Sequence, residues 1–431
     1  MKKEIIKEII RDFHLEDLPE LFERDIEVSL SSGKIISLIG ARRSGKTSFL
    51  FNTIEKLKKK GVDRKKILYL NFEDERLDLK TDELDLLLQA YRELYPDLNL
   101  RDCHLFFDEI QNIKNWEKFV RRLYDSVTKN IFITGSNSKF LSTDIATSLR
   151  GRTLSYEVYP LSFKEYLRFN KVGIDLYSSK SVAKVNNYLL KYLDNGGFPE
   201  VVHYDDRLRE KVLQEYFNVM IYRDLVERYE IKNMAVLKFF IKRILASSTK
   251  QLSVNTIYNE LKSSGFKLGK NQLYEYLDAC QSIYLAFVLK KYAHKLVSLE
   301  LGDRKVYSID NGLLNAVNFR FSEDKGKAME QVVFLELKRR GKELYFYKGR
   351  YECDFIVKEG NTVSEIIQVS YSLSNEKTKK REIRGIVDVC KEFGMKNGMI
   401  ITTEAAPDFE VEKIIIKVVP LYRWLLTQRQ V

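Results

Sequence analysis

The sequence contains little proline, few histidines and only four cysteines. With 6 Pro and 20 Gly among 431 residues, a collagen-like or Pro-rich disordered chain is excluded, since both need far more of these residues. The cysteines form no CxxC pair, and the chain has 4 His in all. We therefore expect buried free thiols instead of a zinc site or a disulfide framework.

Long apolar runs are also absent from the sequence. A membrane-spanning helix needs about 18 or more consecutive apolar residues. The first ten residues mix acids and bases at helical spacing and lack the apolar segment of a signal peptide. These absences predict a cytoplasmic protein. Hydrophobic residues make up 44% of the chain, and at about 100 to 200 residues per domain its length predicts two to four globular domains.

The first third of the chain alternates short aliphatic segments with amphipathic stretches. The aliphatic segments are 35–39, 67–72, 105–107 and 131–134. Apolar runs without alternation are typical of strands covered on both faces. We expect an N-terminal helical segment (1–30) and then an α/β domain with a parallel sheet (31–165).

The remaining chain predicts three further parts. Residues 166–235 read as a helical lid, interrupted by the Asn-Gly-Gly-Phe-Pro turn at 195–199. Residues 236–320 read as a winged helix-turn-helix. Its expected helices and strands are 253–264, 270–283, 284–289 and 304–309. Residues 321–431 read as helix, three strands, helix and strand.

The strongest motif is a GxxxxGK[ST] phosphate loop, directly after the first predicted strand and before a helical pattern. It comprises Gly40, Ala41, Arg42, Arg43, Ser44, Gly45, Lys46 and Thr47, and Ser48 follows it. Its glycines allow backbone N–H groups to surround phosphates, and the helix N-terminus adds positive potential. Lys46 is expected to contact the β- and γ-phosphates of ATP, and the Thr47 hydroxyl to bind Mg²⁺.

Two acids end the third predicted strand, Asp108 and Glu109. We expect Asp108 to hold Mg²⁺ through water and Glu109 to orient and polarise the attacking water. An acidic turn after a buried strand is the alternative interpretation.

Two further candidates follow the fourth predicted strand. Ser136 or Asn137 is expected to contact the γ-phosphate as a sensor, although a simple Gly-Ser-Asn turn explains the same residues. Arg152 is a candidate arginine finger that stabilises transition-state charge, which would involve self-association if it acts on a second chain. A surface arginine is the alternative.

Several motifs together resemble the AAA+-like P-loop ATPases of archaea and bacteria. Besides the phosphate loop and Asp108–Gln111, they are Asn71–Asp74, Gly135–Ser138, Leu149–Arg152, Tyr159–Phe163, Gly196–Glu200, Tyr222–Asp224 and Asp310–Gly312. The resemblance covers nearly the whole chain. It implies an ATPase core followed by a winged helix and, in many members, a restriction-endonuclease-like domain, with ATP and Mg²⁺ as cofactors.

The excess of basic residues lies in one segment. Residues 231–320 contain 14 Lys and Arg but only 6 Asp and Glu, as expected of a module that binds a polyanion such as duplex DNA. Candidate contacts at the second helix and the wing are Lys267, Lys270, Asn271, Gln272, Tyr274, Lys290, Lys291, His294 and Lys295. Protein docking and a basic surface without a partner are the alternatives.

The C-terminal segment resembles the restriction-endonuclease-like fold. An active site of this kind needs an acid on the second strand and an acid-x-Lys on the third. Asp354 occupies the first position, but Gln368 and Ser370 occupy the other two. Glu330 is a possible additional carboxylate. We therefore expect an inactive domain that lacks both the charge to hold Mg²⁺ and a cation near the phosphate.

Taken together, these patterns predict a Mg²⁺-dependent ATPase whose nucleotide state controls a DNA-binding winged helix and a nuclease-like domain. Two alternatives belong to other classes. One is an ATP-dependent DNA nuclease, and the other is a nucleotide-gated signalling switch that binds only protein partners.

Overall fold

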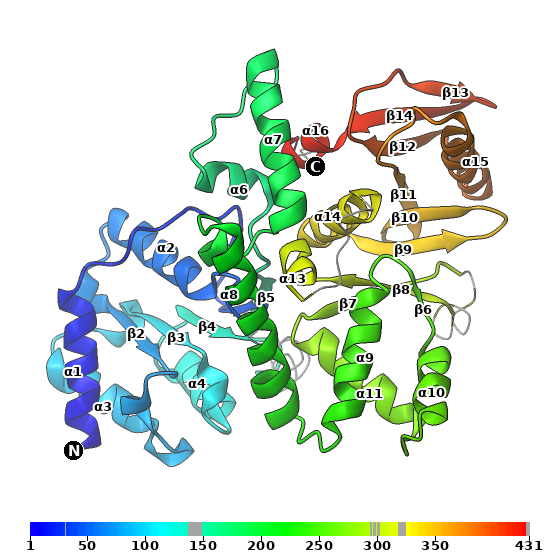
Figure 1. Ribbon diagram of the computed structural model, residues 1–431. Coiled ribbons are helices and arrows are strands. Elements are labelled where there is room, and N and C mark those ends of the chain that lie inside the picture. Colours follow the sequence, from blue (N-terminus) through cyan, green and yellow to red (C-terminus); the bar gives the residue numbers. More distant parts are fainter. Residues whose placement is uncertain are drawn as a thin grey trace. The chain divides into compact units, whose positions relative to one another are not determined.

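The computed structural model describes residues 1–30, 32–136, 149–293, 295, 299, 302–317 and 325–427. They form two compact units, Met1–Tyr159 and Pro160–Val431, which run from blue to cyan and from green to red in Figure 1. Among the described residues, every helix is too short or too polar to cross a bilayer. All four cysteines are buried and free, as predicted.

The N-terminal unit contains a parallel five-stranded sheet in the order β2-β3-β4-β1-β5. Its strands are β1 (Ile35–Ile39), β2 (Ile67–Asn71), β3 (His104–Asp108), β4 (Ile131–Gly135) and β5 (Thr153–Glu157). The first four confirm the predicted α/β sheet. The fifth, β5, was not predicted because it is a partly exposed edge strand of mostly polar residues.

Four α-helices accompany this sheet in the described residues: α1 (Lys2–Leu15), α2 (Lys46–Lys59), α3 (Asp85–Leu94) and α4 (Trp116–Ser126). Leu50 and Ile54 of α2 pack against Leu38, Phe106 and Phe132 of the sheet in one buried core. Because the strands are parallel, the loops after β1, β3 and β4 leave the sheet at the same edge. The phosphate loop and the two acids at the end of β3 therefore lie at that edge.

The C-terminal unit begins with helices. They are α6 (Phe163–Phe169), α7 (Ser179–Asn195), α8 (Asp206–Val219) and the π-helical segment Met220–Glu227. The predicted winged-helix segment then follows as α9 (Met234–Ala246), β6 (Gln251–Leu252), α10 (Val254–Ser263), α11 (Lys270–Ser282), β7 (Ala286–Lys290) and β8 (Arg304–Ser308). Its antiparallel sheet has the order β6-β8-β7, so a third strand joins the two that were expected.

The rest of the C-terminal unit contains a six-stranded mixed sheet in the order β13-β14-β12-β11-β10-β9. Its strands are β9 (Glu343–Lys348), β10 (Glu352–Glu359), β11 (Thr362–Val369), β12 (Asn397–Thr402), β13 (Phe409–Val411) and β14 (Ile414–Pro420). Its helices are α13 (Asn311–Ala316), α14 (Lys325–Arg339), α15 (Glu376–Glu392) and α16 (Leu421–Leu426). Ile386 and Cys390 of α15 pack on Ile400 of β12.

Short 3₁₀ helices connect these elements. They are Arg64–Lys66, Glu75–Leu77, Thr81–Glu83, Leu100–Asp102, Ile110–Asn112 and Pro199–Val201.

Two glycine motifs far apart in the sequence meet inside the C-terminal unit. The buried Asp310 carboxylate accepts the backbone N–H groups of Gly197 at 2.7 Å and Leu313 at 3.0 Å. A Cβ atom on Gly196, whose φ is +73°, would lie 1.9 Å from Asp310 Oδ1. A Cβ atom on Gly312 would lie 2.1 Å from the Asn195 carbonyl oxygen. The close approach of α7 to α13 therefore requires glycine at both positions.

We predict that Gly196→Ala lowers the free energy of unfolding of the C-terminal unit by about 2 kcal/mol or more, because it combines left-handed backbone strain with a clash against a buried carboxylate. Chemical denaturation followed by circular dichroism measures this change. Gly173→Ala is the matched control, since its Cβ would meet no atom within 4 Å. Equal stability of the two variants would contradict the prediction.

Candidate nucleotide site

The phosphate loop connects the carboxyl end of β1 to the first turn of α2. Gly40 has a φ of +156°, and a Cβ atom there would lie 2.2 Å from the Val158 carbonyl oxygen. Gly45 and Arg43 have φ values of +97° and +61°. These left-handed residues bend the loop around the N-terminus of α2. The resulting backbone concavity fits an anion.

Lys46 places its ammonium group inside this loop. Its side chain is 4% exposed, and Nζ donates to the carbonyl oxygens of Gly40 at 3.2 Å and Ala41 at 3.1 Å. Nζ also lies 3.5 Å from Glu109 Oε1. The lysine is thus held by the loop and by one acid, in the place where a phosphate-binding lysine is expected.

Asp108 is buried and accepts three hydroxyl groups. Thr47 Oγ1 donates at 2.7 Å and Tyr69 Oη at 3.0 Å, both to Oδ2, and Thr134 Oγ1 donates to Oδ1. Burial raises the pKa of Asp108 above its usual value, although the hydrogen bonds from Thr134 and Thr47 act in the opposite direction. The carboxylate is therefore positioned from three strands and the phosphate loop.

Glu109 follows β3 in a left-handed conformation with φ +51°, and such strain is common at functional sites. Its N–H donates to Thr134 Oγ1 at 2.9 Å, and Gln111 donates to its side chain. Burial alone would raise the pKa of Glu109, but Lys46 and Gln111 hold it below the ordinary value. Glu109 is therefore ionised at neutral pH.

The site fits a magnesium nucleotide by two structural criteria. The hydroxyls of Ser44 and Ser136 are buried and have no hydrogen-bond partner in the described part of the chain, although buried polar groups ordinarily have one. Ser44 lies in the phosphate loop and Ser136 directly follows β4. Thr47 and Asp108 present adjacent oxygen atoms, the ligands that Mg²⁺ prefers. These residues would hold the metal and the phosphates.

The other residues predicted for the site differ in their burial and contacts. Arg42 forms an ion pair with Glu73 at 3.1 Å, whereas Arg43 and Ser48 are exposed. Ala41 is fully buried. Asn137 lies outside the described residues, so its role as a sensor stays a prediction.

Arg152 does not belong to the nucleotide site of its own chain. Its carbonyl oxygen accepts the N–H of Ile35 at the amino end of β1, whereas the phosphate loop follows the carboxyl end. Its guanidinium pairs with Asp125 at 3.0 Å. The predicted role of Arg152 as an arginine finger therefore depends on action on a second chain, and it stays a prediction.

Sequence reasoning missed three residues of the site, Tyr69, Gln111 and Thr134. Thr134 interrupts the apolar run of β4, and a buried hydroxyl near a strand end is a usable signal. Tyr69 carries no such signal, because only the pairing of β2 with β3 places it beside Asp108. Gln111 lies two residues after Glu109, within the motif Asp108–Gln111, but no role was assigned to it.

Comparison with known proteins agrees with this geometry. Residues 32–167 match the family described as an AAA domain, and residues 186–324 and 325–424 match two domains of unknown function, DUF8612 and DUF4143. The uncharacterized protein MJ1544 of Methanocaldococcus jannaschii is 39% identical over 99% of this chain and 96% of its own. An uncharacterized protein of Haemophilus influenzae is 30% identical over 91% of this chain and 94% of its own.

The chain belongs to the same family as these two proteins. Its AAA domain, with the five-stranded parallel sheet, gives the N-terminal unit the fold of a P-loop ATPase and indicates that it binds nucleotide.

Solved structures are also similar. The Walker-type ATPase paby2304 of Pyrococcus abyssi has a TM-score of 0.43 and 16% identity, covering 70% of this chain and 99% of that one. The ORC1 protein of Aeropyrum pernix, solved in complex with DNA, has a TM-score of 0.30 and 12% identity, covering 75% and 91%.

We predict that Thr134→Val destabilises the AAA domain by about 1–3 kcal/mol, because it removes a donor to the buried Asp108 and an acceptor for the Glu109 N–H. Thr134→Ser retains the hydroxyl and is the matched control. Urea denaturation of both variants measures the difference. Equal stability of Val and Ser variants would show that the hydroxyl contributes nothing.

Proposed function

We propose that this protein is a Mg²⁺-dependent ATPase whose nucleotide state controls DNA binding by the C-terminal unit. One observation supports the ATPase activity most directly. Lys46, Thr47, Asp108 and Glu109 converge on one glycine-rich loop, so a phosphate-binding cation, two metal-binding oxygens and an ionised acid share one site.

Each residue of this set has a separate task. Lys46 would contact the β- and γ-phosphates, and Thr47 and Asp108 would hold Mg²⁺. The metal would supply charge neutralisation on the phosphates. Glu109 accepts a hydrogen bond from the attacking water and orients it, since phosphoryl transfer depends mainly on positioning and on stabilisation of charge.

The ion pair between Lys46 and Glu109 keeps both charges paired before a nucleotide binds. While the ammonium lies 3.5 Å from the carboxylate, both groups are neutralised by each other. A γ-phosphate competes for the ammonium, and Glu109 is then released towards water. Binding of ATP thereby frees the carboxylate that orients the attacking water.

We predict that Lys46→Ala abolishes nucleotide binding, whereas Glu109→Gln binds ATP and lowers turnover at least about 100-fold, because the amide cannot polarise water as a carboxylate does. Isothermal titration measures binding, and phosphate release measures turnover. Glu8→Gln on the exposed face of α1 is the control. Wild-type turnover in Glu109→Gln would contradict the role of Glu109.

DNA binding by residues 234–308 is the second part of the proposal. The element order α9-β6-α10-α11-β7-β8 with sheet order β6-β8-β7 is consistent with the expected winged helix-turn-helix. Lys267 and Asn271 are exposed before and within the first turn of α11. Lys270 and Arg304 both lie over the Tyr274 ring, 5.8 Å from its centroid. The start of α11 therefore presents cations and an amide together.

The wing contributes less than expected. Lys291, directly after β7, forms an isolated bridge with Phe346, and Tyr292 donates its N–H to the Phe346 carbonyl oxygen at 2.7 Å. Lys290 and Lys291 are therefore half-buried beside β9, and His294 lies outside the described residues. We accordingly assign the main DNA contacts to the start of α11 and retain Lys295, which is exposed, as a secondary contact.

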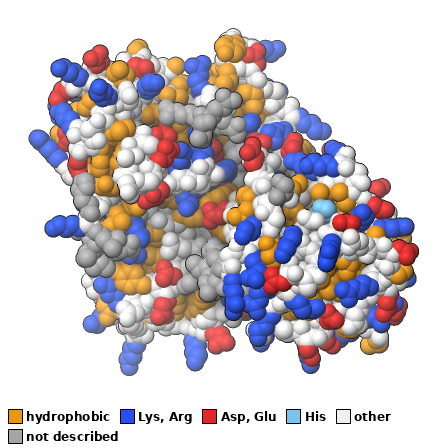
Figure 2. Space-filling view, turned by 180° about the vertical axis from the view of Figure 1, so that it is seen from behind, with side chains coloured by type: hydrophobic (Ala, Val, Ile, Leu, Met, Phe, Trp, Pro, Cys, Tyr) orange, Lys and Arg blue, Asp and Glu red, His pale blue; other side chains and the backbone are white. Residues whose placement is uncertain are grey.

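Surface charge by itself does not identify the DNA-binding face. Figure 2 shows Lys and Arg side chains spread over the face that it presents, with Asp and Glu side chains among them. The Gln272 side chain already has a hydrogen-bond partner within its own helix, since it donates to Tyr276 Oη at 2.7 Å. Asn271 is therefore the better candidate for a contact with base edges, because it is exposed and asparagine pairs with adenine.

We predict that Lys267→Ala weakens binding equally for all duplex sequences and reduces the salt slope by about one unit, since one phosphate contact is lost. Asn271→Ala should instead change sequence preference. Fluorescence anisotropy at two salt concentrations, with and without ATP, measures both effects, and Lys180→Ala on α7, exposed, is the control. Absence of salt-dependent DNA affinity in the wild type would favour a protein-binding switch.

A further inference from the structure

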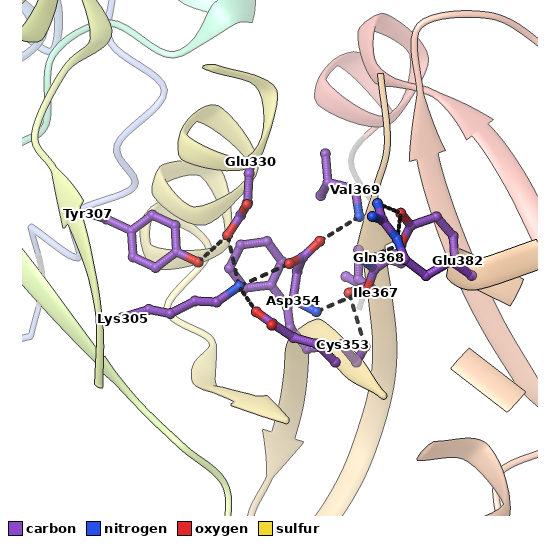
Figure 3. A network of polar contacts seen from close by, with 12 residues as sticks. Lys305, Tyr307, Glu330, Cys353, Asp354, Ile367, Gln368, Val369 and Glu382 are labelled. Carbon is purple, nitrogen blue, oxygen red and sulfur yellow. Dashed lines mark hydrogen bonds and ion pairs between the residues drawn. The ribbon is translucent and has the colours of Figure 1, made fainter. Parts of the chain in front are cut away.

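The C-terminal unit contains a polar cavity of about 880 Å³. Its walls come from five elements, namely β8, α14, β10, β11 and α15, and from the loops beside them. The position expected for a nuclease site, around Asp354, lies in this cavity. Figure 3 shows the side chains that meet there.

Lys305 of β8 lies at the centre of this network. Only 3% of its side chain is exposed, and Nζ lies 2.8 Å from Glu352 Oε1, 3.1 Å from Asp354 Oδ1 and 3.3 Å from Glu330 Oε1. A buried ammonium is tolerated only when charged or polar partners surround it. Burial lowers the pKa of Lys305, but Asp354, Glu330 and Glu352 together raise it above its usual value.

Other contacts fix the carboxylates on this ammonium. The second oxygen of Asp354 accepts the Val369 N–H at 3.0 Å, and Tyr307 Oη donates to Glu330 at 2.7 Å. Gln368 accepts the Asp354 N–H at 3.1 Å and donates to Glu382 at 2.7 Å. The carboxylates of Asp354 and Glu330 are therefore held in place on Lys305 by neighbouring groups.

This geometry corrects the expectation that the domain lacks a cation and has few carboxylates near Asp354. Lysine is absent from position 370, where the buried Ser370 instead donates to the Ser372 carbonyl oxygen. The cation comes from Lys305, 49 residues before Asp354. Glu330 does face the site. Glu352 was missed, although it lies two residues before Asp354 on the same strand and such residues share a face.

We propose that Lys305 is the built-in cation of a carboxylate site that would otherwise bind a divalent metal ion. The fold resemblance implies Mg²⁺ at Asp354, and the residues present do not fit that ion. The ammonium occupies the point where Glu330, Glu352 and Asp354 converge, and it bonds to an oxygen of each. With Lys305 lying between these carboxylates, no group of His, Cys, Asp and Glu among the described residues is positioned to hold a metal.

The charges explain why one cation excludes the other. A divalent ion beside Asp354 would lie within a few ångströms of the Lys305 ammonium, and this repulsion is strong in a buried site. When Lys305 is removed, three carboxylates remain in a cavity open to water, and their oxygens suit Mn²⁺ or Mg²⁺. The cavity thus has the carboxylates of a metal site, and the Lys305 ammonium keeps a divalent ion out.

The experiment measures Mn²⁺ binding to the full chain by electron paramagnetic resonance, without nucleotide. Lys305→Ala should gain a Mn²⁺ site that the wild type lacks, and Lys305→Ala with Asp354→Asn should lose it again. Lys250→Ala, an exposed lysine of the same segment, makes the same change in charge and should gain nothing. Lys305→Arg should also stay metal-free.

Thermal unfolding provides a second readout if Lys305→Ala folds poorly. Mn²⁺ should raise the melting temperature of Lys305→Ala or Lys305→Met by more than it raises that of the wild type. The proposal is overturned if the wild type binds Mn²⁺ in a manner that Asp354→Asn abolishes. It is equally overturned if Lys305→Ala and Lys305→Met both gain no Mn²⁺ site, or if both stay unfolded with and without Mn²⁺. Neither measurement depends on ATP turnover.

Discussion

Buried charge must be neutralised by neighbouring groups, and this constraint organises both units of the protein. In the AAA domain, Lys46 and Glu109 neutralise each other inside the phosphate loop. In the C-terminal unit, Lys305 neutralises Asp354 and Glu330, which are buried beside it. A lone charge in either place would be strongly unfavourable, so the elements that carry these residues are held together by the requirement for a partner.

The constraint has a structural consequence in the C-terminal unit. Lys305 lies on β8, in the segment that we interpret as a winged helix, whereas its three carboxylates lie on α14 and β10. The same elements share an apolar contact, because the Tyr307 and Phe334 rings stack with centroids 4.0 Å apart. Ser308 and Gln331 add hydrogen bonds. Any movement of β8 therefore acts directly on the cavity wall.

The sequence was sufficient where chemistry depends on residues close together along the chain. The loop from Gly40 to Thr47 and the pair Asp108–Glu109 follow predicted strands, so parallel pairing alone brings them to one edge. The sequence was insufficient where interacting residues lie far apart along the chain. Lys305 reads as a basic residue of a wing, and only the pairing of β8 with β7 and its packing on α14 direct it towards Asp354. The strand β5 was not predicted because an edge strand needs few apolar residues.

Two aspartates of this chain show how the partner of a carboxylate decides which cation it binds. Asp108 and Asp354 are both buried on strands, and each accepts hydrogen bonds that fix its oxygens. The partners of Asp108 are neutral hydroxyls, which leave its charge available to a metal ion beside Thr47. Asp354 instead bonds to an ammonium, which uses that charge. Carboxylate position alone therefore does not identify a metal site, since the charge of the nearest donor determines whether a divalent ion is accepted or excluded.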